Sequence, residues 1–186
     1  MKALVLSLAA VVGLASTSFG QARAGDVKIE KISPSVVKTP QFALQGGGTI
    51  KRSKDLDWLE VEVEFQTAPE IIEELSFNYK IQINGQLLVG QVDHVDIPKG
   101  RDHFSVAYIA PRVLDKVMNG KNLTSAAVQG IWVDATKQGQ VISTLSTTKT
   151  AVPNLPQVTG KVLNKSQTPF APLWYDRYEA LKATPR

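Results

Sequence analysis

Asp93-His94-Val95-Asp96 is the string in this sequence that comes nearest to a recognisable chemical site. Alternate side chains of a β-strand share a face, so His94 and Asp96 could ligate one metal ion together. A transition-metal site usually takes three or four ligands, and the only other histidine is His103, across an expected turn. We favour the simpler interpretation, a polar strand edge beside a hairpin, and we expect no metal and no other cofactor.

Carboxylates and nucleophiles give no stronger signal for catalysis. Glu60, Glu62 and Glu64 alternate along the chain. Paired carboxylates can perform acid–base work, but this spacing beside Lys80 also fits a solvated sheet face with cross-strand ion pairs, which we favour. The sequence has no Gly-x-Ser-x-Gly nucleophile elbow and no cysteine. We therefore expect no catalytic residues, and we predict that the protein is not an enzyme.

The composition is that of a globular protein. The chain has 186 residues, of which 43% are hydrophobic and 20% are charged, enough for one domain with a single core. The formal charge of +4 falls to about +2 without residues 1–24, and the longest basic run is Lys51-Arg52. So small an excess does not indicate nucleic-acid binding, and the absence of cysteine excludes disulfides and thiolate sites.

Residues 1–24 are typical of a secretory signal. Lys2 precedes the apolar stretch Ala3–Ala15, and the small residues that follow offer cleavage sites after Gly20 or after Ala24. An apolar helix needs roughly 20 residues to span a bilayer, so we favour a cleaved signal over a retained anchor. We expect a secreted protein of the periplasm, outer membrane or cell surface, with no transmembrane segment after cleavage.

Strict alternation predicts the two main strands of the domain, over 58–66 and 75–83. The expected inward residues are Leu59, Val61, Val63 and Phe65 in the first strand and Leu75, Phe77, Tyr79, Ile81 and Ile83 in the second. A polar, proline-broken link over 68–74 separates them. Asn84-Gly85 then predicts a tight hairpin turn. The returning strand, 87–97, carries Leu87, Val89, Val95 and Ile97 on one face and is interrupted by polar residues, which indicates a bulge near Gly90.

The rest of the pattern is also that of short strands. Residues 27–32, 104–108, 127–135 and 141–150 are further strand candidates, and residues 34–40 suit an edge segment or a loop between two prolines. Pro111 to Met118 is the one good internal helix, starting at a proline and ending at Asn119-Gly120. After Thr150 the prolines at 153, 156, 169 and 172 favour extended chain, and the aromatic segment 170–183 could close with a short helix.

These elements predict an all-β fold. We expect an immunoglobulin-like or fibronectin-like antiparallel β-sandwich with one short internal helix and an extended C-terminal segment. The predicted division is a signal peptide over 1–24, the sandwich over 25–150, and a proline-rich C-terminal segment over 151–186 with a short aromatic helix.

Aromatic side chains are the candidate contacts with a partner or a ligand. Trp58 lies on the glutamate face of its strand, where it could anchor a partner or be covered by the C-terminal segment, and we favour the cover. Phe170, Trp174, Tyr175 and Tyr178 are too apolar for a free tail, so they should dock on the domain or on a partner.

The string Thr168–Tyr178 (TPFAPLWYDRY), together with the strand pattern Trp58–Val63 (WLEVEV), resembles one protein family. It is the small secreted immunoglobulin-like proteins encoded beside type IV pilus and secretin genes in mucus-dwelling Gram-negative bacteria. The resemblance implies an immunoglobulin-like fold and a pilus-associated or outer-membrane role without catalysis, and it carries no site residues.

Two functions follow as hypotheses. The first is a non-catalytic envelope protein that acts through contacts with proteins of a pilus-like or secretion assembly, further copies of itself included, and not with nucleic acid. The alternative is a carbohydrate- or surface-binding sandwich of the adhesin type, which needs an exposed aromatic platform at Trp58, Trp132 or Trp174.

Overall fold

The structure is a computed structural model that describes residues 25–42, 55–121, 123–174 and 176–183. The export signal predicted over 1–24 lies outside these ranges, as does Tyr175. In chain order the elements are β1 (Val27–Lys38), β2 (Asp57–Ile83), β3 (Gln86–Ile109), α1 (Pro111–Met118), the 3₁₀ turn η1 (Ser125–Ala127), β4 (Val128–Lys137), β5 (Gln140–Ser146), β6 (Gln157–Thr159), β7 (Val162–Asn164) and the 3₁₀ turn η2 (Lys165–Gln167).

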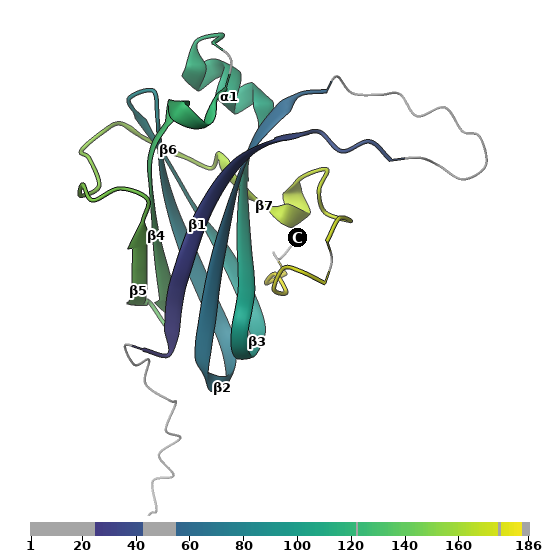
Figure 1. Ribbon diagram of the computed structural model, residues 1–186, viewed down its shortest axis with the longest axis vertical. Helices are drawn as coiled ribbons and strands as arrows, with labels where there is room; N and C mark the ends of the chain where they lie inside the picture. The colour runs from purple at the N-terminus through teal and green to yellow at the C-terminus, as the bar shows by residue number, and fades with distance from the viewer. Residues whose placement is uncertain (1–24, 43–54, 122, 175, 184–186) are drawn as a thin grey trace, which may run out of the picture.

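Two long strands, β2 and β3, pass through both layers of the molecule and bend together on the way (Figure 1). Before the bend β2 pairs with β1, and after it β2 pairs with β4. One layer therefore holds β1, the first half of β2, the second half of β3, and β7. The other holds β5, β4, the second half of β2, the first half of β3, and β6. The expected immunoglobulin-like β-sandwich with one short helix is thus confirmed.

The period-2 pattern of β2 is confirmed on both sides of the bend. Nine side chains at alternate positions point into the core and are at most 1% exposed: Leu59, Val61, Val63, Phe65, Leu75, Phe77, Tyr79, Ile81 and Ile83. The link expected over 68–74 is not a loop, because the strand continues through it with shifted register. Thr67 holds the bend: its hydroxyl donates to the Pro98 carbonyl at 2.7 Å and accepts from the Gly100 amide at 3.0 Å.

The bulge expected near Gly90 is wrong. β3 pairs with β2 in unbroken register from Gln86 to Val95, and Asp96 adopts a positive φ of 54° where the bend begins. The side chains of Leu88, Val92 and His94 therefore point inward, and Val89 and Val95 are only partly buried. Gly90 has a packing role instead, because a Cβ there would lie 2.5 Å from the Cβ of Val162 in β7.

Local sequence signals set the turn and the helix where they were expected. Asn84 and Gly85 take positive φ angles of 45° and 74° in the β2–β3 turn, as a two-residue hairpin requires. Helix α1 starts at Pro111 and ends where Asn119 turns left-handed at φ 51°. The helix lies over one end of the sandwich (Figure 1), and its Leu114, Val117 and Met118 belong to the core. The Asn84 side-chain amide donates to the Val117 carbonyl at 2.8 Å.

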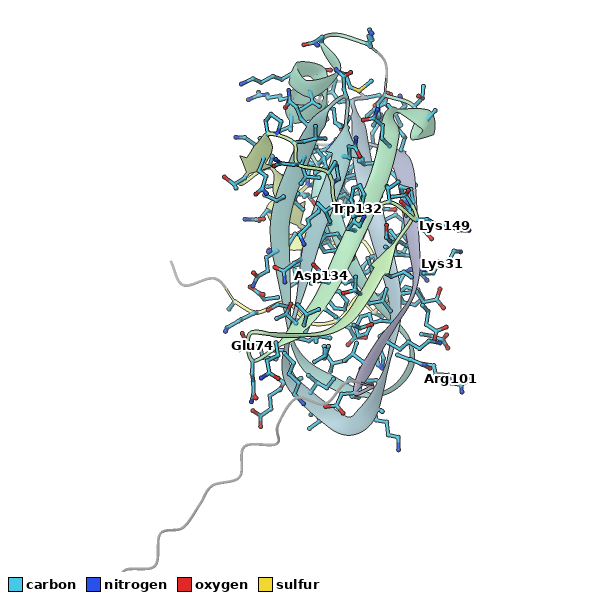
Figure 2. All side chains as sticks on the ribbon, turned by 90° about the vertical axis from the view of Figure 1, so that its left-hand side faces the viewer. Lys31, Glu74, Arg101, Trp132, Asp134 and Lys149 are labelled. Atoms are coloured by element: carbon cyan, nitrogen blue, oxygen red, sulfur yellow. The ribbon has the colours of Figure 1, made fainter. Side chains whose placement is uncertain are left out.

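The outer face of β4 is also covered in part. Figure 2 shows Trp132 and Asp134 side by side along this strand. Trp132 is only 5% exposed, and its indole N–H donates to the Thr150 carbonyl at 2.9 Å. Asp134 pairs with Lys80 of β2 at 2.8 Å. Lys80 is therefore not the partner of the glutamates at 60, 62 and 64, contrary to the expected cross-strand pairs.

Gly90→Ala should destabilise the fold by about 1–3 kcal/mol, because the added methyl meets a branched Cβ that cannot move aside. Urea unfolding measures this cost, and Gln91→Ala on the exposed side of β3 is the neutral control. In a Val162→Gly background the penalty of Gly90→Ala should shrink, because the opposing Cβ is gone. An equal penalty in both backgrounds would show that packing against Val162 is not the reason for the glycine.

Candidate functional site

Residues 165–174 and 176–182, which we call the C-terminal strap, close one open side of the sandwich. After β7 pairs with the end of β3, the strap crosses the outer face of the first layer and returns to β3 near its bend (Figure 1). The Glu179 amide donates to the Phe104 carbonyl at 3.2 Å, and the Val95 amide donates to the Ala180 carbonyl at 3.0 Å. The strap thereby bonds to both halves of β3, one in each layer.

The short helix expected within 170–183 is not formed. The described residues of this range make successive turns, such as Leu173 N–H to the Phe170 carbonyl at 2.9 Å, and a single bridge between Leu181 and His94. Pro172 cannot donate a helical hydrogen bond, and the amides near the end of the strap are committed to β3. The edge of the sheet therefore offers this segment better partners than its own backbone does.

A small aromatic cluster fastens the strap to the outer face of the first layer. The Phe170 ring stacks on Tyr108 with centroids 4.7 Å apart and planes at 6°, and it meets Trp58 edge-on at 5.5 Å and 89°. Phe170 is 2% exposed and Trp58 is 8% exposed. The indole N–H of Trp58 donates to the Thr39 hydroxyl at 3.0 Å. Trp58 is thus covered by the C-terminal segment, and neither of these two candidates offers a free surface to a partner.

Arg177 joins the strap to the glutamate face of β2. Its guanidinium makes two hydrogen bonds to Glu62, at 2.9 and 2.7 Å, and lies 3.9 Å from the centroid of the Phe104 ring. The Tyr178 hydroxyl donates to the same carboxylate at 2.9 Å. These bonds, led by Arg177, lower the pKa of Glu62 against the opposing effect of burial. The glutamate face is therefore partly an internal contact of the chain and not a fully solvated surface.

His94 lies in a buried chain of hydrogen bonds. Its Nε2 is 2.8 Å from the Ser105 hydroxyl, which is 2.8 Å from the Tyr79 hydroxyl, and its Nδ1 is 3.2 Å from the Glu179 carbonyl. One arrangement of hydrogens gives every polar atom of this network a partner. In it the Tyr79 hydroxyl donates to Ser105, the Ser105 hydroxyl donates to Nε2 of His94, and Nδ1–H of His94 donates to the Glu179 carbonyl. This hydrogen-bond arrangement requires a neutral imidazole. Burial lowers the pKa of His94, which favours the neutral form.

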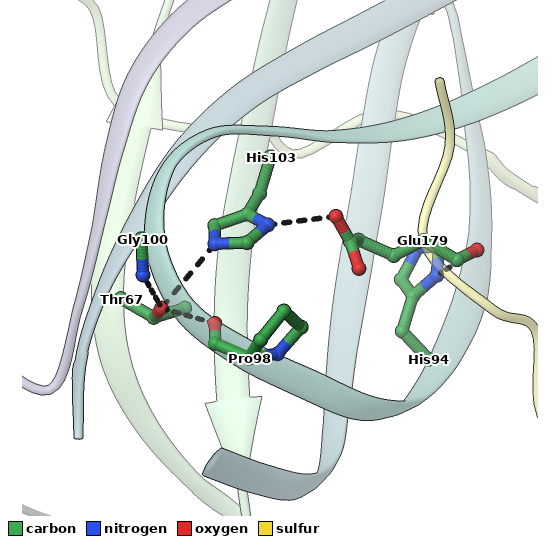
Figure 3. Close-up of polar contacts among 6 residues, drawn as sticks. All are labelled: Thr67, His94, Pro98, Gly100, His103 and Glu179. Carbon is green, nitrogen blue, oxygen red and sulfur yellow. Dashed lines mark hydrogen bonds and ion pairs between the residues drawn. The ribbon is translucent and has the colours of Figure 1, made fainter. Parts of the chain in front are cut away.

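His103 ties the bend to the strap (Figure 3). Its Nδ1–H donates to Glu179 Oε1 at 2.7 Å, and its Nε2 is 3.4 Å from the hydroxyl of Thr67. Glu179 is therefore held twice, by its carbonyl at His94 and by its carboxylate at His103. Asp96, by contrast, is exposed at the start of the bend, so His94 and Asp96 do not face a common point. No cluster of three metal-ligating side chains occurs in the described ranges.

A pocket of about 370 Å³ lies between the strap and β3, with His94 in its wall. Both imidazole nitrogens already have partners, and the Ser105 side chain beyond the imidazole is fully buried. The Ser–His pair has the distances of a nucleophile and a base, yet its hydroxyl is not open to a substrate. The pair of Ser105 and His94 therefore helps to hold the strap, because His94 is hydrogen-bonded to the Glu179 carbonyl.

Trp174 is the aromatic candidate that the structure presents to solvent. Its side chain is 52% exposed, and its backbone has a φ of 48°, in the left-handed region where a bulky residue is unfavourable. Its carbonyl accepts from Lys165 Nζ at 3.2 Å and from the Arg177 amide at 3.2 Å. These two hydrogen bonds stabilise the strained turn. Phe170, which precedes the turn, is packed between Tyr108 and Trp58.

The other candidates differ in their environment. Tyr178 is half-buried at Glu62 and Lys165, whose ammonium lies 5.2 Å from the centre of its ring. Tyr175 lies outside the described residues. Sequence reasoning missed the anchoring roles of Lys165, Arg177 and Glu179. Arg177 and Glu179 pair with residues more than 70 positions away, which leaves no local periodicity. Lys165 contacts Trp174 and Tyr178 within an irregular segment that has no periodic pattern either. The inward position of His94 would have followed from an unbroken register after the Asn84-Gly85 turn.

A protein-family model matches residues 19–185 of this chain. The chain belongs to that family. Its fold is similar to that of a protein from Akkermansia muciniphila solved by crystallography, with a TM-score of 0.73 and 21% sequence identity over 86% of this chain and 94% of the other. This likeness shows the shared fold. No match was found among curated proteins. Within the described ranges, no helix is both long and apolar enough to cross a membrane.

Glu62→Gln should cost about 1 kcal/mol of unfolding free energy at pH 7, because the bidentate pair with Arg177 is only partly screened by solvent. The pKa of Glu62 is lowered from 4.5, so its contribution is present above pH 4.5 and is lost as the pH falls through the folded-state value. Denaturant titrations of wild type and variant should converge in acid. Glu64→Gln is the control on the same strand face, and a double cycle with Arg177→Met should recover the coupling.

His94→Gln should flatten the pH dependence of stability between pH 7 and pH 5. Burial lowers the pKa of His94 from 6.5, so the unfolded chain takes up a proton first and the fold loses stability as the pH falls below 6.5. Thermal melts at a series of pH values give the slope. Equal slopes for wild type and variant would mean that His94 does not stay neutral in the folded protein.

Proposed function

We propose that this chain is a non-catalytic, exported envelope protein that acts through protein–protein contacts in a pilus-like or secretion assembly. Export through a signal at residues 1–24 is part of the proposal. Its support is the resemblance of Thr168–Tyr178 and Trp58–Val63 to secreted immunoglobulin-like proteins encoded with such assemblies. Membership of a family that spans residues 19–185, and the fold shared with a protein from Akkermansia muciniphila, agree with it.

The hydrogen bonds of the buried polar side chains support a binding role over a catalytic one. His94, Ser105 and Tyr79 satisfy one another inside the sandwich, and His103 is committed to Glu179. A general base or a nucleophile must lie within hydrogen-bond distance of a substrate atom. His94 and His103 are instead hydrogen-bonded to Glu179 of the strap, and Ser105 is bonded to His94 and Tyr79. Through these contacts the strap joins both halves of β3.

The exposed side chain of Trp174 is the observation on which this proposal rests. Large aromatic side chains dominate the binding energy of protein interfaces, and an unfavourable backbone angle at an exposed position is a mark of a functional constraint. The backbone of Trp174 is left-handed, a conformation that asparagine or glycine adopts more easily than tryptophan does. The indole is nevertheless about half exposed. The strained turn holds this side chain out from the strap.

The same observation favours one second candidate, a carbohydrate-binding role. Of the three tryptophans, Trp58 and Trp132 are buried, so an aromatic platform for a sugar ring would have to rest on Trp174. One aromatic side chain gives a smaller platform than several. The protein–protein role therefore stands first.

Trp174→Asn should leave the fold intact at a cost on the order of 1 kcal/mol, because asparagine relieves the left-handed backbone strain while the buried half of the indole surface is lost. The same change should abolish capture of pilus or secretin components from cross-linked envelope extracts. Val141→Thr, at a comparably exposed position on β5, is the matched control and should capture as wild type does.

Wild-type protein that captures no such component would overturn the assembly role. Binding on a glycan array that Trp174→Asn abolishes would instead establish the carbohydrate role.

A further inference from the structure

The pocket under the strap contains a buried cation, the ammonium of Lys165. Lys165 lines this pocket of about 370 Å³ and is only 6% exposed. Its ammonium donates to the Trp174 carbonyl at 3.2 Å and lies over the Tyr178 ring. In the described part of the chain no carboxylate lies within ion-pair distance of it, in contrast to Lys80, Lys137 and Lys182.

A buried ammonium without a direct ion-pair partner costs free energy. Lysine has three N–H donors, and the carbonyl of Trp174 uses one, while the face of Tyr178 attracts the charge without accepting a full hydrogen bond. Burial lowers the pKa of Lys165, and the charge of Asp176, which makes no direct ion pair with this ammonium, opposes only part of that effect. An anion entering the pocket would supply the missing acceptor.

The remaining walls define the rest of the ligand. Val106, Ala171 and Leu181 give the pocket apolar surface, and the carboxylate of Glu179 points to His103, which satisfies it. A highly charged anion would lose hydration free energy on entering a pocket with these apolar walls. A single negative charge joined to a compact hydrocarbon body fits both the lone ammonium and its surroundings.

We propose that this pocket is a binding site for small carboxylates with an apolar body, in which Lys165 pairs with the carboxylate. The site lies on the inner side of the strap, whereas the side chain of Trp174 faces solvent. The proposal therefore does not depend on the partner role assigned to Trp174.

The test is a titration of the full mature protein with phenylacetate, followed by backbone amide NMR. Saturable shifts should appear at Lys165, Tyr178 and Leu181 at concentrations up to about 10 mM. Phenylacetamide, which has the same shape without the charge, should bind at least about tenfold more weakly because the charge-assisted bond is lost. Inorganic phosphate should bind no better than the amide.

Two variants separate binding from folding. Lys165→Met should remove the preference for the acid over the amide, and Lys161→Met at an exposed position is its control. Ala171→Leu adds bulk at an exposed wall of the pocket and keeps the ammonium, so it should weaken phenylacetate binding while thermal melts show an intact fold. The proposal is overturned if no saturable shift occurs, if acid, amide and phosphate bind alike, or if Ala171→Leu binds as wild type does.

Discussion

The bend shared by β2 and β3 is the constraint on which the rest of this structure depends. His94 and Ser105 belong to the same strand, and a straight strand would hold their side chains more than 30 Å apart, at about 3.3 Å per residue. The bend returns β3 across the core, so the two side chains meet at 2.8 Å. Thr67, opposite Pro98 and Gly100, satisfies the backbone groups that the change of register leaves free.

The bend also leaves an open side between the layers, and the strap fills it. Phe170 buries the aromatic outer face of the first layer, Arg177 neutralises Glu62, and Glu179 joins the two histidines. Each contact alone is worth on the order of 1 kcal/mol. Together they hold a segment that contains little regular secondary structure, since its order comes from the surface beneath it.

This arrangement connects the fold to the proposed functions. A strap anchored on both sides can present Trp174 in an unfavourable backbone conformation, because neighbouring contacts compensate the strain. The same anchoring encloses a pocket around Lys165 that the strap does not fill. The outer side of the strap suits a protein partner and the inner side suits a small ligand, so the two roles can be tested by separate substitutions.

The sequence by itself determined the elements whose signals are local. Alternation placed nine inward residues of β2, Asn84-Gly85 placed a hairpin, and Pro111 with Asn119 bounded a helix, because side-chain periodicity and backbone angles depend on near neighbours. The continuity of β2 through its polar link, the inward side of β3 and the turns of the strap were decided by tertiary structure. They depend on partners far along the chain, such as Val162 for Gly90, Glu62 for Arg177 and His103 for Glu179. No local pattern encodes such pairs, since their free energy exists only once the layers have met.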